Sequence, residues 1–142
     1  MKLKHLLIVL GEPYSIFSEI LFKSFKDNSI KKFKKKIILI GSKRLLKKQM
    51  LKLGFNYKLN EIKLHEINKL KTHKDKINII NINFKFRKVF DKISIRSSNY
   101  IQNSFETSLK IIKNYQFKGL INGPISKKHF LNKKYLGITE YL

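Results

Sequence analysis

The chain opens with a continuous apolar run at residues 6–10, which ends in the turn Gly11-Glu12-Pro13. A short strand that is apolar on both faces is typical of the buried interior of a parallel sheet. Proline has no amide hydrogen and favours an extended residue before it, so we expect the strand to end near Gly11. Ser15 can cap a following helix, whose apolar residues return at helical spacing: Ile16, Phe17, Ile20, Leu21 and Phe25.

The same pattern then repeats. Residues 37–40 form a second apolar strand, Gly41 turns the chain, and Ser42 is the expected cap of a helix with apolar residues Leu45, Leu46, Met50 and Leu53. Gly54 follows in the position of a left-handed helix cap. The lysine-rich segment 31–36 between the two units is predicted to be a solvated connection. Two strand–helix units in succession predict parallel strands with a right-handed crossover.

The second half continues the alternation. Segment 62–76 is charged and ambiguous, whereas residues 77–84 alternate well enough to predict a strand with one polar face. Residues 85–95 resemble a connection. Ser97 or Ser98 can cap the longest helix, whose stripe is Ile101, Phe105, Ser108 or Leu109, Ile112 and Tyr115. A last strand begins at residues 120–121 and leads into the turn 122–126, so the chain reads as one α/β unit without repeats.

Charge is the unusual feature of the composition. Lys and Arg total 32 against 9 Asp and Glu, a net charge of +23, which ordinarily suggests a nucleic-acid or anionic-membrane partner. However, the chain has 29 Lys but 3 Arg, with 21 Ile, 12 Asn and no Ala, a skew toward residues with A/T-rich codons. Codon bias can therefore produce the lysines, and we expect no specific nucleic-acid partner. The absence of Cys excludes disulfides, and no apolar run is long enough for a membrane span, so we predict a cytoplasmic protein.

Three turns follow apolar strands, at residues 11–15, 41–43 and 123–127. In an open parallel sheet such turns gather at the carboxyl ends of the strands, where ligands bind, although Gly and Pro after a strand are also ordinary turn residues. None of the turns fits a dinucleotide or P-loop pattern. The four histidines show no metal-ligand spacing. Glu12 and Glu140 are the carboxylates nearest the predicted pocket.

Three segments in order carry a family resemblance. Gly11-Glu-Pro-Tyr-Ser-Ile-Phe-Ser-Glu-Ile20 resembles a G-[DE]-P-A-G-I-G-P-E-I motif, Gly123-Pro-Ile-Ser-Lys127 matches G-P-I-[NS]-K, and Gly137-Ile-Thr-Glu-Tyr-Leu142 is similar to G-H-T-E-[FY]-L. These are motifs of the 4-hydroxythreonine-4-phosphate dehydrogenase family of pyridoxal phosphate biosynthesis. The resemblance covers all 142 residues and corresponds to somewhat under half of a family member.

The resemblance implies a three-layer α/β/α fold that is isopropylmalate/isocitrate-dehydrogenase-like and incomplete at the C-terminus. Residues 1–142 would be the N-terminal part of the dehydrogenase, namely the strand–helix units of the first domain and the start of the interdomain cleft, with the remainder of the enzyme absent. It implies NAD and a divalent metal ion as cofactors, a small phosphorylated amino-acid substrate and a homodimer. The family's metal ligands lie beyond the third motif, so no histidine here is assigned as a ligand, and the fragment alone is expected to be inactive.

By the same resemblance, Thr139 matches the substrate-binding threonine of the family, and Lys127 matches the motif lysine, a cation suited to a phosphorylated substrate. Ile138 stands where the family has a substrate-binding histidine, and isoleucine can neither donate a hydrogen bond nor carry charge. Ser15 and Phe17 also replace glycines. Catalytic and NAD-binding residues are left unassigned.

Two other classes of function stay open. The chain could be a small basic α/β module that binds nucleic acid or another polyanion, or a degenerate relative that keeps the fold and has lost catalysis. Sequence-selective binding at near-physiological salt would favour the first alternative. If Ile138→His in the complete protein increased neither activity nor substrate affinity, the degenerate relative would be favoured.

Overall fold

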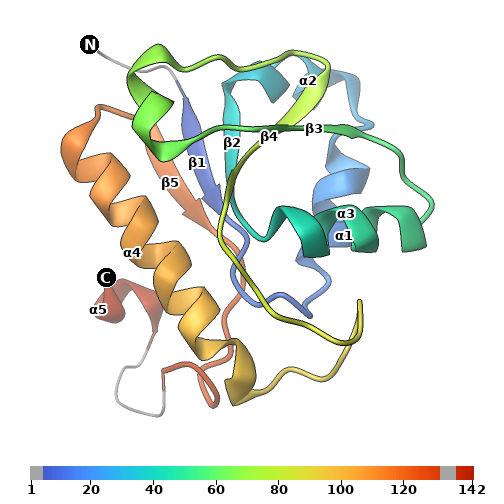
Figure 1. The fold of residues 1–142 in the computed structure, drawn as a ribbon, viewed down its shortest axis with the longest axis vertical. Helices are drawn as coiled ribbons and strands as arrows, with labels where there is room; N and C mark the ends of the chain where they lie inside the picture. Colours follow the sequence, from blue (N-terminus) through green and yellow to red (C-terminus); the bar gives the residue numbers. More distant parts are fainter. Residues whose placement is uncertain (1–4, 132–136) are drawn as a thin grey trace.

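A computed structural model describes residues 5–131 and 137–142. Its centre is a five-stranded sheet in the order β3-β4-β2-β1-β5, in which every neighbouring pair is parallel. The strands are β1 (Leu6–Val9), β2 (Ile37–Gly41), β3 (Lys58–Glu61), β4 (Lys76–Asn81) and β5 (Gly119–Asn122). The predicted parallel strand–helix units are therefore confirmed, and all five strands end at the same edge of the sheet (Figure 1).

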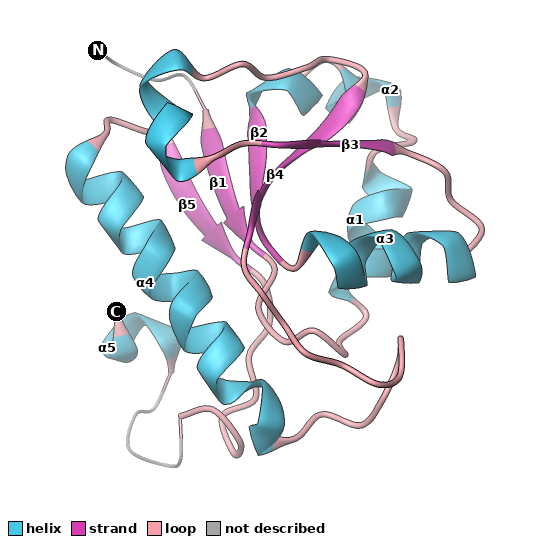
Figure 2. Cartoon of the chain, in the orientation of Figure 1, coloured by secondary structure: helices cyan, strands magenta, loops and turns pink. Residues whose placement is uncertain are grey.

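Helices cover both faces of this sheet (Figure 2). The longer ones are α1 (Phe17–Ser24), α3 (Lys43–Lys52) and α4 (Ser98–Asn114); the short elements are α2 (Asn28–Lys31), α5 (Ile138–Tyr141) and the 3-10 turns η1 (Lys34–Lys36), η2 (Leu64–Lys69) and η3 (Ile95–Ser97). None of the helices in the described part of the chain has the length and hydropathy that crossing a lipid bilayer requires.

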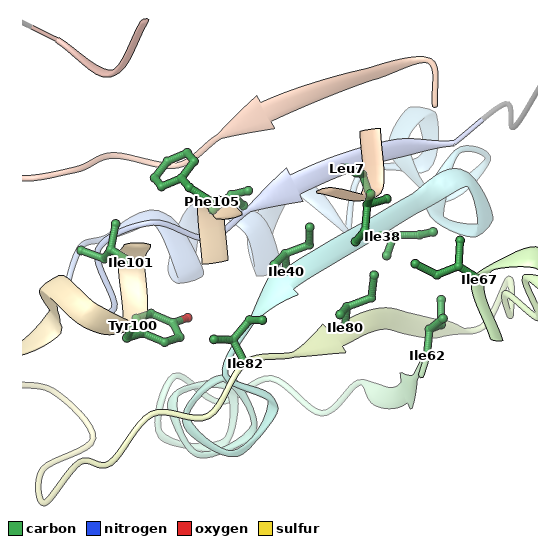
Figure 3. Close-up of a cluster of buried hydrophobic side chains, with 12 residues drawn as sticks. Leu7, Ile38, Ile40, Ile62, Ile67, Ile80, Ile82, Tyr100, Ile101 and Phe105 are labelled. Carbon is green, nitrogen blue, oxygen red and sulfur yellow. The ribbon is translucent and has the colours of Figure 1, made fainter. Parts of the chain in front are cut away.

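On one face, α4 and η2 pack against the sheet around a buried cluster (Figure 3). Alternate strand residues such as Leu7, Ile38 and Ile80 meet Ile101 and Phe105 of α4. On the other face, the remaining strand residues meet α1 and α3; this second cluster is Ile8, Leu10, Leu21, Phe22, Phe25, Leu39, Leu46, Met50, Phe55, Ile77 and Ile79. Because β1 and β2 bury side chains in both directions, their continuous apolar runs are explained, and the three-layer α/β/α arrangement is confirmed.

The prediction for residues 77–84 was wrong in two respects, because β4 ends at Asn81 and has no exposed polar face. It lies between β2 and β3, and Asn78 is buried. The Asn78 side chain receives hydrogen bonds from Asn60 Nδ2 (2.9 Å) and the His73 amide (2.9 Å), and donates one to the His73 carbonyl (3.1 Å). These bonds satisfy the buried amide, so a polar residue is tolerated in a covered strand.

Two other predictions need correction. Ile16 and Ile20 are exposed, whereas Leu21 and Phe25 of the predicted stripe are buried, together with Phe22. The segment 31–36 is not fully solvated, because Lys34 is 7% exposed and its Nζ lies 4.7 Å from the centroid of the Tyr57 ring. A lysine can be buried in this way when its stem packs on apolar surface and its ammonium lies over an aromatic ring.

Candidate functional site at the carboxyl edge of the sheet

The first and the last predicted turns meet at the carboxyl edge of the sheet. The Glu12 amide donates to the Pro124 carbonyl (2.8 Å), and the Gly123 amide donates to the Val9 carbonyl (2.7 Å). β1 and β5 are neighbours in the sheet, so two segments about 110 residues apart in sequence leave it side by side. The gathering of these turns, predicted from the strand pattern, is confirmed.

Two glycines make this close approach possible. Gly11 has a φ of +71°, and a Cβ there would lie 2.4 Å from the Pro124 carbonyl oxygen. A Cβ at Gly123 would lie 2.2 Å from the Leu10 carbonyl oxygen. Since both clashes involve backbone atoms, which cannot rotate away, only glycine fits at either position.

The third predicted turn is held by Tyr100 of α4. The Tyr100 hydroxyl accepts a hydrogen bond from the Ser42 amide (3.0 Å), and the Ser42 side chain caps α3 by accepting from the Leu45 amide (3.2 Å), as predicted. Burial raises the pKa of Tyr100 to about 12, so the phenol stays neutral over the physiological pH range. Tyr100 therefore fixes the start of α3 relative to α4 and carries no charge into the site.

Glu12 is the buried carboxyl group of this edge, with an exposed fraction of 3%. The Ser97 hydroxyl donates to Glu12 Oε1 (2.8 Å), while Oε2 is buried and has no hydrogen-bond partner among the described residues. Burial raises the pKa of the Glu12 carboxyl above its ordinary value, and the hydrogen bond from Ser97 opposes part of that effect. Glu12 thus combines a raised proton affinity with one oxygen that can still donate or accept a hydrogen bond.

The residues assigned by resemblance lie on the segments that follow β5. Lys127 is exposed in the turn after β5, Thr139 is exposed on α5, and Ile138 is half-buried against the α4 cluster. Aromatic contacts hold α5 in place: the Tyr141 ring lies 5.1 Å from that of Phe130 and 6.3 Å from that of Phe105. Their substrate-binding roles stay predictions, and so does any role of Glu140, which is exposed on α5.

Two of the histidines, His129 and His5, make contacts that stabilise the fold. The His129 carbonyl accepts a hydrogen bond from the Ser98 hydroxyl (3.1 Å), which ties the turn after β5 to the start of α4. The His5 ring is partly buried, 6.5 Å from Phe117, and burial lowers its pKa, helped by Lys36 and Lys35. Within residues 5–131 and 137–142, no group of three or more His, Cys, Asp or Glu side chains could hold a metal ion.

Sequence reasoning missed the contacts of Ser97 and Tyr100. Ser97 was a candidate helix cap, yet it makes no capping bond; its hydroxyl, which has one hydrogen, lies within hydrogen-bonding distance of both Glu12 Oε1 (2.8 Å) and the Ser94 carbonyl (3.0 Å). Tyr100 carried no local signal, because its partner Ser42 is 58 residues away. Only a knowledge of which helix covers which strand ends could have found these two residues.

One protein family matches most of the chain. Residues 33–142, well over half of the chain, match the family described as pyridoxal phosphate biosynthetic protein PdxA. Among curated proteins, none matches this sequence.

Solved structures give the fold independently. A 4-hydroxythreonine-4-phosphate dehydrogenase from Burkholderia phymatum superposes with a TM-score of 0.80 at 17% identity, over 99% of this chain. One from Klebsiella pneumoniae superposes with a TM-score of 0.74 at 15% identity, over 94% of this chain. This chain spans 42% of the length of each. At identities this low, the superpositions establish only the fold. They confirm the predicted fold class.

Proposed function

The chain belongs to the family of pyridoxal phosphate biosynthetic protein PdxA, and from this premise we propose that it forms the N-terminal part of an NAD-dependent, metal-assisted dehydrogenase. The proposed reaction oxidises 4-phosphohydroxy-L-threonine and decarboxylates the product. One observation supports the proposal: the Gly11 turn and the Gly123 turn, which resemble two motifs of that family, fold against each other at the edge where an α/β sheet binds ligands.

Each residue of the proposed site has a role that fits its chemistry. The exposed Lys127 ammonium supplies a positive charge for the substrate phosphate, and the Thr139 hydroxyl supplies a donor or acceptor for a polar substrate group. Ile138 adds only apolar contact. Glu12, through its unpartnered Oε2, is the group in this chain best able to hold or release a proton at the sheet edge.

NAD would supply the hydride acceptor of this reaction, and a divalent metal ion would polarise the substrate hydroxyl. The described residues contain no cluster able to hold the metal, and none of the three turns has a dinucleotide-binding pattern. We therefore assign no ligand for either group in this chain. The proposed enzyme is a homodimer in the cytoplasm, as the resemblance implies.

The activity test measures NADH formation with 4-phosphohydroxythreonine, NAD and a divalent metal ion, using the protein expressed from its complete reading frame. We expect turnover that depends on both substrate and metal. A folded protein that produces no NADH under these conditions would contradict the proposal.

A second test addresses Ile138, the departure from the family motif. If the site binds substrate in the family manner, Ile138→His should lower the KM for the phosphorylated substrate, because imidazole adds a hydrogen-bond partner worth about tenfold in affinity. Steady-state kinetics of both proteins give the comparison, with Ile121→His, at an exposed position of β5, as a control for adding a histidine. If Ile138→His gained neither activity nor substrate affinity, a degenerate relative without catalysis would be favoured.

A further inference from the structure

A second feature of the carboxyl edge is a cavity of about 630 Å³ between Tyr14 and residues 84–96. Residues 82–94, which connect β4 to η3, have no regular secondary structure. Aromatic and basic side chains share the lining, among them Tyr14, Phe84, Phe86, Arg87, Lys88 and Arg96. A hollow of this size, apolar on one side with a few polar groups, is typical of a small-molecule site.

The chain concentrates its arginines here. It has 29 Lys and 3 Arg, so nearly all of its cationic side chains are lysines. Arg87 and Arg96 line the cavity, and the guanidinium of the third, Arg44, lies 5.2 Å from the centroid of the Phe86 ring, which is part of the same wall. Arginine differs from lysine in its planar fork of donors, which binds phosphate oxygens in pairs.

The two lining guanidinium groups are available to a ligand. No ion pair or side-chain hydrogen bond to either group is formed within the described segments. Together with Lys85 and Lys88 they face one carboxylate in the lining, Asp91, which leaves the wall with an excess of positive charge. A concave surface concentrates that field, which favours an anion inside the cavity.

The aromatic part of the wall is held in a defined geometry. The Phe84 and Phe86 rings are nearly parallel, at 22° and 6.2 Å between centroids, and the Tyr14 ring meets Phe84 edge-on at 6.0 Å. Phe84 also packs 4.8 Å from the buried Tyr100 ring. The Tyr14 hydroxyl donates to the Lys88 carbonyl (3.3 Å), which joins the two sides of the cavity. A flat ring can therefore pack on a wall that is already formed.

We propose that this cavity binds a small phosphorylated ligand that carries an aromatic ring, with the phosphate at Arg87 and Arg96 and the ring against Phe84 and Phe86. This inference goes beyond the proposed substrate, because 4-phosphohydroxythreonine contains no ring. It also does not depend on the dehydrogenase reaction, since binding alone is required. NAD carries rings as well as phosphates, so displacement of phenyl phosphate from this cavity by NAD would overturn the proposal of a separate site.

Calorimetric titration with phenyl phosphate and with inorganic phosphate at 150 mM NaCl tests the proposal. We expect phenyl phosphate to bind at least about fivefold more tightly than phosphate, since ring stacking adds about 1 kcal/mol. Arg87→Gln and Arg96→Gln should each weaken phenyl phosphate binding about tenfold, the loss of one charged hydrogen-bonding group. Lys113→Gln is the matched control, with the same change of charge in the last turn of α4, and should stay within about twofold.

Phe86→Leu tests the aromatic wall separately. It should abolish the preference for phenyl phosphate and leave phosphate binding unchanged, because the arginine side chains remain. If a variant fails to fold, amide shift mapping of the unmodified protein with phenyl phosphate replaces it, and shifts confined to Tyr14 and residues 84–96 are expected. Equal loss in Lys113→Gln, equal affinity for both probes, shifts spread over the lysine-rich surface, or no binding at 10 mM phenyl phosphate would each overturn the proposal.

Discussion

The buried carboxyl of Glu12 should be visible in the pH dependence of stability. Its pKa in the folded chain lies above the ordinary value of 4.5, so the folded chain holds the proton to higher pH than the unfolded chain does. The free energy of unfolding must then fall as pH rises from about 4.5 through the folded pKa, by about 1.4 kcal/mol for each unit of difference. Glu12→Gln should remove this fall and be at least as stable as the unmodified protein at pH 7.

Urea unfolding between pH 4 and 8 measures the effect as the difference between the two proteins, because the other carboxylates are common to both. Ser97→Ala provides the complementary variant. The Ser97 hydroxyl favours the charged form of Glu12, so its loss should move the fall to higher pH. A Glu12→Gln curve that runs parallel to that of the unmodified protein would contradict the assignment.

At the same scale, the sequence identified Glu12 by its place after a strand but could not reveal its environment. Its partner Ser97 is 85 residues away, and the local pattern gave Ser97 a capping role that the hydroxyl does not perform. Ile16 and Ile20 likewise fit a helical stripe by spacing, yet they are exposed. Spacing fixes which residues share a helix face but not how far the neighbouring layer extends over that face.

A single added methyl group can break the contact between the turn at residues 11–15 and the turn at residues 123–127. Gly123→Ala places a Cβ 2.2 Å from the Leu10 carbonyl oxygen, so β1 and β5 must separate locally. We expect a loss of at least about 2 kcal/mol in the free energy of unfolding, measured by urea denaturation. Gly119→Ala is the control at the start of the same strand, where the nearest atom is Leu6 Cδ2 at 3.5 Å, and it should be neutral or up to about 1 kcal/mol stabilising. Equal effects of the two substitutions would argue against the turn contact.

The strands and helices could be predicted where burial on one or both faces leaves a regular pattern of apolar residues. β1 and β2 were found because strands covered on both faces are continuously apolar. β3 (Lys58–Glu61) was missed, since only Leu59 of its four residues is apolar and its strand conformation depends on pairing with β4. Lys34 was misassigned for the related reason that aromatic rings distant in sequence cover it. Tertiary contacts of this kind override local propensity.

For the molecule as a whole, the net charge of +23 is the dominant property. Mutual repulsion of like charges destabilises the compact state and is screened by salt. Raising NaCl from 20 mM to 500 mM should increase the melting temperature by about 3 °C or more, equivalent to ~1 kcal/mol, in a calorimetric or circular dichroism melt. A melting temperature independent of salt would show that the charges are too dispersed to repel effectively.

The same charge separates the dehydrogenase proposal from the nucleic-acid alternative. If the lysines reflect codon bias, DNA, RNA and heparin should bind alike at low salt, and binding should weaken steeply as salt rises. Fluorescence anisotropy over a salt series gives the slope for each polymer. Sequence-selective binding that survives 150 mM salt would support a nucleic-acid module instead.

The position of β1 within the sheet has a consequence for synthesis of the chain. β1 lies between β2 and β5, so the backbone groups on one of its sides find their partners only when residues 119–122 have left the ribosome. Until then Leu6–Val9 forms an apolar edge, the kind of surface that nascent-chain chaperones protect and that other chains can join. Late closure of this edge makes folding depend on contacts between distant parts of the sequence, which is characteristic of slow folding.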